Sequence, residues 1–69
     1  MKISARNQIQ GTVSKIEKGA TTSHVSIEIG NGVIVMAAIT NEAVAELGLK
    51  DGEPVYAVIK ASDVMVGID

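Results

Sequence analysis

The sequence contains no cysteine, phenylalanine or tryptophan, and Tyr56 is its only aromatic residue. Without cysteine the chain can form neither disulfide bonds nor thiolate metal clusters, and its single histidine, His24, cannot build a zinc site alone. Aromatic side chains supply much of the buried area in most cores, so a core of Val, Ile and Ala is thin for 69 residues. Because small domains without disulfides or metals usually depend on self-association, we expect an obligate oligomer; a compact monomer is the alternative.

Strong charge of one sign is also missing, and so is any long hydrophobic run. The net charge of -2 argues against a nucleic-acid partner, which normally requires a basic surface, and aromatic residues that could stack on bases are lacking. The longest apolar run, residues 33–39, is far too short to span a bilayer. Met1 begins a polar stretch, which predicts no signal peptide, no membrane partner and a cytoplasmic location.

Alternating apolar residues and turn residues divide the chain into short segments. Five of these segments are predicted to be strands: residues 9–16, 25–29, 33–39, 55–59 and 64–68. Gly30-Asn31-Gly32 indicates a hairpin turn, because both residue types tolerate positive φ. Thr40 and Asn41 are favourable N-caps for a helix over residues 42–47.

This order of elements predicts a single domain over residues 1–69 that is mainly all-β. Five short strands, with one short helix between strands three and four, suggest a small OB-like five-stranded barrel. An open antiparallel sheet is the competing architecture. We favour the barrel because closure removes the sheet edges that otherwise invite aggregation.

Patterns for catalysis and metal binding are scarce. His24 has no flanking carboxylate nearer than Glu28, and such a residue is more often a half-exposed strand histidine than a catalytic base. The acidic residues show no calcium-ligand spacing, and no Gly-rich phosphate loop is present. We therefore predict that the chain is not an enzyme, ligates no metal directly and uses no catalytic cofactor.

Small hydrogen-bond donors gather near two positive charges. Residues 4–8, Ser-Ala-Arg-Asn-Gln, combine a hydroxyl, a guanidinium and two carboxamides, while residues 60–62, Lys-Ala-Ser, add an ammonium and a second hydroxyl. Thr40 places another hydroxyl just before the predicted helix. A tetrahedral dianion has only acceptor atoms, so it requires N–H or O–H donors and a cation. Taken alone, each piece is also an ordinary polar segment, surface lysine or helix cap, and sequence spacing does not show that Arg6 and Lys60 meet.

Residues 4–8, followed by Gly11, closely resemble the opening signature of the molbindins, or Mop domains. Further matches follow in collinear order over essentially the whole chain: Ile16-Glu17-Lys18-Gly19-Ala20, Ala38-Ile39-Thr40, Leu47-Gly48-Leu49, the Gly52 turn, Lys60-Ala61-Ser62 and Val64-Met65-Val66-Gly67. The resemblance implies an OB-like barrel that assembles as a homo-hexamer, a trimer of dimers in which strands are exchanged between neighbours. It also implies that molybdate or tungstate is bound at subunit interfaces, for intracellular molybdenum storage or homeostasis.

The same resemblance implies two sets of binding residues. The positions matching the interface site are Ser4, Arg6, Thr40, Lys60, Ala61 (through its backbone N–H) and Ser62. The positions matching a second anion site, built largely from backbone amides and small polar residues, are Gly19, Ala20, Thr22, Ser23 and His24. His24 stands where many relatives carry an acidic residue, and we hypothesise that this difference makes the region less repulsive to anions.

Two other functions are compatible with the composition. The first is an OB-like protein-interaction adaptor without an anion ligand. The second is binding of a molybdenum–pterin cofactor, which is disfavoured because the chain offers little aromatic surface for a pterin ring. Thermal unfolding with and without molybdate distinguishes the anion-binding protein from the adaptor.

Overall fold

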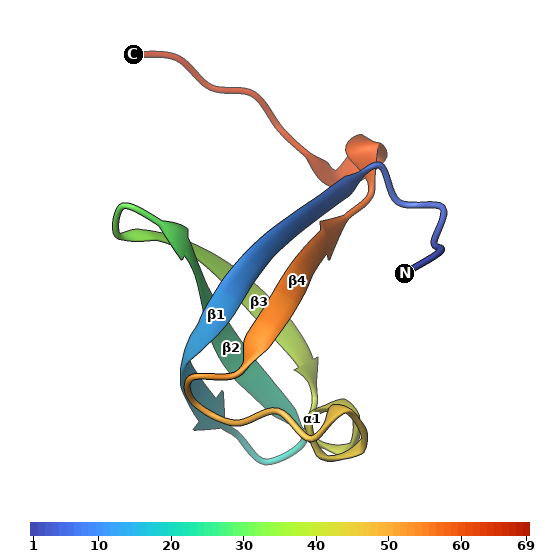
Figure 1. The fold of residues 1–69 in the computed structure, drawn as a ribbon, viewed down its shortest axis with the longest axis vertical. Coiled ribbons are helices and arrows are strands. Elements are labelled where there is room, and N and C mark those ends of the chain that lie inside the picture. Colours follow the sequence, from blue (N-terminus) through green and yellow to red (C-terminus); the bar gives the residue numbers. More distant parts are fainter.

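The computed structural model describes all 69 residues and centres on one four-stranded antiparallel sheet that curls into a half-barrel (Figure 1). In chain order the elements are β1 (Asn7–Lys18), β2 (Thr22–Gly30), β3 (Val33–Thr40), α1 (Asn41–Leu47), β4 (Pro54–Ile59) and a short 3-10 turn, η1 (Ala61–Asp63). The strands lie in the order β3-β2-β1-β4, so β1 joins the β2–β3 hairpin to β4. The mainly β, OB-like class with one short helix is confirmed.

Strand β1 uses its two halves to pair with different neighbours. Its first half, from Asn7 to Thr12, pairs with β4, and its second half, from Thr12 to Lys18, pairs with β2. Close to this change of partner, a Cβ atom on Gly11 would lie 2.6 Å from the backbone oxygen of Glu28. Only glycine allows β1 and β2 to approach so closely, and we attribute the curl of the sheet at this point to that approach.

The core lies inside the half-barrel and is small. Its buried apolar side chains are Val13, Val25, Ile27 and Ala57, which come from β1, β2 and β4. Beside them lies a groove of about 840 Å³, lined almost entirely by apolar residues from the strands, the α1–β4 connection and the N-terminal segment. The chain therefore leaves an apolar groove open beside its core, and a partner that filled the groove would bury this surface.

The local turn and cap signals of the sequence are confirmed. In the β2–β3 turn, Asn31 and Gly32 both have positive φ, at 52° and 75°, as a two-residue type I′ hairpin requires. Thr40 caps α1, because the Ala43 N–H donates to its Oγ1 at 3.1 Å, and Gly48 ends the helix with φ at 63°. The helix has seven residues, and no helix in the structure has the length and apolarity needed to span a bilayer.

The predicted fifth strand at residues 64–68 is wrong. After η1 the chain forms no strand, and its last residues run away from the sheet (Figure 1). Met65, Val66 and Ile68 are each more than nine-tenths exposed. A strand requires a hydrogen-bonding neighbour, and β-forming residues do not supply one by themselves. The sheet stays open within the chain, since β3 and β4 do not pair and both are edge strands.

Candidate functional site

The residues predicted for the interface site lie at two opposite ends of the sheet (Figure 1). At one end, Asn7 of β1 pairs with Ile59 of β4, so the next residues outward, Arg6 and Lys60, are neighbours where these strands end. The Asn7 Nδ2 donates to the Ile59 carbonyl oxygen at 3.1 Å, which fixes the junction. We call this group the cationic end; it comprises Ser4, Arg6, Lys60, Ala61 and Ser62.

The cationic end carries two positive charges that form no ion pair, although the carboxylate of Asp63 lies in the same turn, η1. The only ion pair of the chain joins Lys15 and Glu17, with nitrogen and oxygen 3.6 Å apart, so neither Arg6 nor Lys60 is paired. Every residue of this end is exposed. Unpaired cations at an exposed position attract anions from solution.

Backbone donors are available at the same end. The N–H groups of Ala61 and Ser62 donate to no group in the chain, whereas the next N–H, that of Asp63, donates to the Lys60 carbonyl oxygen at 2.9 Å. This pattern follows from the 3-10 turn, because the first N–H groups of a helical turn have no internal acceptor. Cations together with free N–H and O–H donors are the groups that a tetrahedral dianion requires.

Thr40 lies at the other end of the sheet, beside the turn that joins β1 to β2. It is the register partner of Thr22, so a single chain does not bring it close to Arg6 and Lys60. Its Oγ1 accepts from the Ala43 N–H, and a hydroxyl that accepts in this way still has its own hydrogen to donate. Thr40 can therefore cap α1 and donate to an anion at the same time.

Asn41, the first residue of α1, fastens the β1–β2 turn to the helix. Its Oδ1 accepts from the Ser23 hydroxyl at 2.5 Å. Its Nδ2 donates to the carbonyl oxygens of Gly19 at 3.0 Å and Ala20 at 3.3 Å. Its backbone N–H donates to the Thr21 carbonyl oxygen at 2.9 Å. One residue thus contacts most of the turn.

We call this second group the clamped end; it comprises residues 19–23, Thr40 and Asn41. In the sequence, Asn41 stands out only as a helix cap, because the partners of its side chain lie 18 to 22 residues away and leave no local pattern. Its part in the clamped end is visible only once β1, β2 and β3 are paired.

Of the predicted second-site residues, Gly19 and Ala20 lie in the β1–β2 turn, and Thr22 and Ser23 are the first two residues of β2. The Ser23 side chain is 1% exposed, and its hydroxyl donates inward to Asn41. The next residue, His24, is exposed and points to the opposite face of the sheet, where its register partner on β1 is Glu17. His24 therefore does not share a face with Ser23.

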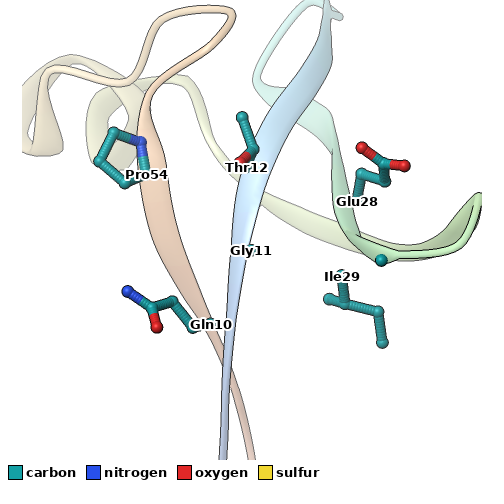
Figure 2. Close-up of a pocket in the computed structure, with 7 residues that line it drawn as sticks. Gln10, Gly11, Thr12, Glu28, Ile29 and Pro54 are labelled. Carbon is teal, nitrogen blue, oxygen red and sulfur yellow. The ribbon is translucent and has the colours of Figure 1, made fainter.

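A shallow hollow of about 390 Å³ lies where β1 runs between β2 and β4, and it contains none of the predicted site residues (Figure 2). Its lining residues are Gln10, Gly11, Thr12, Glu28, Ile29, Gly30 and Pro54. Glu28 is the only charged residue among them, and its carboxylate repels anions. The donors suited to an oxyanion are at the two ends of the sheet.

Comparison with known proteins places the chain in a family. The TOBE domain family matches residues 3–66. The chain belongs to this family, as a molbindin. The resemblance to the molbindins seen in the sequence is thereby confirmed.

The similarity to individual molbindins covers the whole chain or nearly all of it. A "probable molybdenum-pterin-binding protein" of Haemophilus influenzae is 48% identical over 69 residues, which is 100% of both chains. The structure of a molybdate-binding protein from Sporomusa ovata has a TM-score of 0.91 and 38% identity, covering 99% of this chain and 100% of that one. The cytoplasmic molybdate-binding protein ModG, with molybdate bound, has a TM-score of 0.93 and 46% identity over 100% of this chain and 49% of its own. All three are named as binding proteins.

Proposed function

We propose that this chain binds molybdate or tungstate as a free oxyanion, by hydrogen bonds and charge, and catalyses no reaction. The observation that carries the proposal is the cationic end, where two unpaired cations lie beside free hydroxyl and N–H donors. Molybdate binding by the structural relatives supports this choice of anion. The corresponding role is molybdenum storage or homeostasis in the cytoplasm, the compartment in which ModG is described.

The interface site combines residues from two copies of the chain. One copy contributes Arg6, Lys60, the two serine hydroxyls and the Ala61 N–H of its cationic end. The second copy contributes the Thr40 hydroxyl, because Thr40 lies at the opposite end of the sheet from the cationic end of its own chain. Each anion is then held without direct ligation of the metal atom.

The resemblance to the molbindins implies a homo-hexamer, a trimer of dimers with exchanged strands, and the exposed apolar surfaces support self-association of the chain. Residues 64–69 are exposed and largely apolar, and the groove of the half-barrel is open between two free strand edges. A tail from a neighbouring copy that lay along a free edge would gain the hydrogen bonds that it lacks in the single chain. The neighbour would also cover apolar surface that the single chain leaves in water.

We propose a second anion site at the clamped end, with Gly19, Ala20, Thr22 and Ser23 as its residues and with His24 next to them on β2. Backbone N–H groups are the main donors there, since the clamped end contains no charged residue. The Ser23 hydroxyl is used by Asn41, so Ser23 serves this site by holding the turn. His24 lies on the other face of β2 and adds no negative charge to this region.

Thermal unfolding tests the proposal directly. A ligand that binds only the folded state raises the free energy of unfolding by about 2.7 kcal/mol at a hundredfold excess over its Kd. We expect millimolar molybdate and tungstate to raise the Tm, and sulfate to raise it less, because sulfate has the same charge and shape but is smaller. The absence of a shift with all three anions would contradict anion binding and favour the adaptor function.

A further inference from the structure

The β1–β2 turn has an ordered set of carbonyl groups. Three consecutive carbonyl oxygens, those of Gly19, Ala20 and Thr21, each accept a hydrogen bond from Asn41. The first two accept from the side-chain Nδ2 and the third from the backbone N–H. All three carbonyls therefore point toward one residue at the start of α1.

The direction of a carbonyl fixes the direction of the N–H in the same peptide group. A peptide group is planar and trans, so its C=O and its N–H point to opposite sides of the chain. The N–H of Ala20 belongs to the peptide whose carbonyl is that of Gly19, and the N–H of Thr21 belongs to the peptide whose carbonyl is that of Ala20. With both carbonyls directed at Asn41, both N–H groups are directed away from it.

These two N–H groups are also unused. Neither the Ala20 N–H nor the Thr21 N–H donates to any group in the chain, and both residues are exposed. The turn is held on its other side as well, because the Gly19 N–H donates to the Thr22 carbonyl oxygen at 2.9 Å. Successive free N–H groups fixed in one turn form the kind of concavity that binds anions.

We propose that Asn41 is a positioning residue that presents the Ala20 and Thr21 N–H groups to an oxyanion at the clamped end. Asn41 does not touch the anion; it holds the turn so that the two donors are already aligned before binding. The Ser23 hydroxyl assists by donating to the Asn41 Oδ1, which keeps the carboxamide oriented with its NH₂ toward the carbonyls. This inference rests on the proposed function and adds to it a residue that the sequence did not single out.

Two variants separate positioning from charge. Asn41→Ala removes the carboxamide without adding charge. Asn41→Asp keeps the acceptor for Ser23 but removes both side-chain donors to the turn. The matched controls are Gln10→Ala, an exposed carboxamide with no hydrogen bond in the chain, and Asn31→Asp, which lies in the hairpin turn at the far end of β2 and β3. The probes are sodium molybdate and sodium sulfate, followed by calorimetry and by the backbone amide signals in NMR spectra.

For the unaltered chain we expect the amide signals of Ala20 and Thr21 to move as molybdate is added. In Asn41→Ala and Asn41→Asp the same signals should respond with an affinity about tenfold weaker, because the backbone of the turn must then be ordered when the anion binds, at a cost of about one residue's conformational freedom. Both controls should match the unaltered chain. Unchanged strand amide signals in the absence of anion show that each variant is folded.

Four results would overturn the inference. Wild-type affinity at Ala20 and Thr21 in Asn41→Ala would show that the turn needs no positioning by this residue. A loss confined to Asn41→Asp would show simple charge repulsion. Molybdate binding that moves the amides of the cationic end but not those of Ala20 and Thr21 would reject the inference and leave the proposed function intact, whereas no binding by the unaltered chain would reject both.

Discussion

The cationic end and the clamped end of the sheet differ in charge and in the number of contacts that hold them. The cationic end carries Arg6 and Lys60 without ionic partners, and all of its residues are exposed. The clamped end contains no charged residue, yet Asn41 alone takes part in four hydrogen bonds there. Attraction for an anion and a fixed arrangement of donors are thus found at opposite ends of one chain. In the proposed interface site, Thr40 of one copy joins Arg6 and Lys60 of another.

The largest expected effect comes from removing a charge at the cationic end. Arg6→Ala or Lys60→Ala should weaken molybdate binding by on the order of 2–5 kcal/mol, because each removes a charged partner of an anion enclosed between chains. Calorimetry measures the change. Lys15→Ala, which removes a cation from the middle of β1, is the control and should leave the affinity nearly unchanged. Near-native affinity in both Arg6→Ala and Lys60→Ala would refute the assigned interface site.

The clamped end is held by more side-chain hydrogen bonds than the cationic end, so substitutions at the two ends should lower the free energy of unfolding by different amounts. Asn41→Ala should lower the free energy of unfolding by about 2 kcal/mol, since three side-chain hydrogen bonds are lost and Ser23 is left buried without its acceptor. Asn7→Ala removes one hydrogen bond at the cationic end and should cost about 1 kcal/mol. Urea unfolding without anion measures both values. Equal losses in the two variants would contradict the contrast between the ends.

Thr40 should show a smaller effect with two parts. Thr40→Ala removes the cap of α1 and should lower the free energy of unfolding by about 1 kcal/mol. It should also weaken molybdate binding, because the donated O–H is lost. Thr40→Ser keeps the hydroxyl and should preserve both properties. If Thr40→Ser binds as weakly as Thr40→Ala, the methyl group rather than the hydroxyl is what matters, and Thr40 is not a ligand.

The smallest expected effect is at His24. His24→Glu adds a negative charge on the face of β2 opposite to Ser23, and we expect a modest loss of affinity at the clamped end with the same number of sites. Anion titration measures affinity and stoichiometry together. Unchanged values for both would remove the hypothesis that His24 makes this region less repulsive to anions.

The features that could be predicted from the sequence are those that depend on near neighbours in the chain. Asn31 and Gly32 specify the β2–β3 turn, and Thr40 and Gly48 mark the ends of α1, because turns and caps are decided by a few adjacent residues. Whether residues 64–68 form a fifth strand could not be predicted from adjacent residues alone. Residues 64–68 have the right composition, but a strand also needs a partner edge, and the single chain does not place one beside them.

The same distinction between local and long-range features applies to the candidate site. The donor types at residues 4–8 and 60–62 are visible in the sequence, but their proximity follows only from the pairing of Asn7 with Ile59. The separation of Thr40 from them and the contacts of Asn41 also depend on how the strands pair. Residue chemistry could therefore be predicted, whereas the grouping into two ends could not.

The central claim is that the interface site takes Arg6 from one copy and Thr40 from another, and a mixed assembly tests it most directly. Chains carrying Arg6→Ala and chains carrying Thr40→Ala are unfolded together in equal amounts, refolded, and titrated with molybdate. An interface between the two kinds of chain contains one site with both changes and one site with neither. Random pairing should therefore restore about a quarter of the native-affinity sites. If the mixture binds no better than the two variants assembled separately, the site is formed within one chain and the account is contradicted.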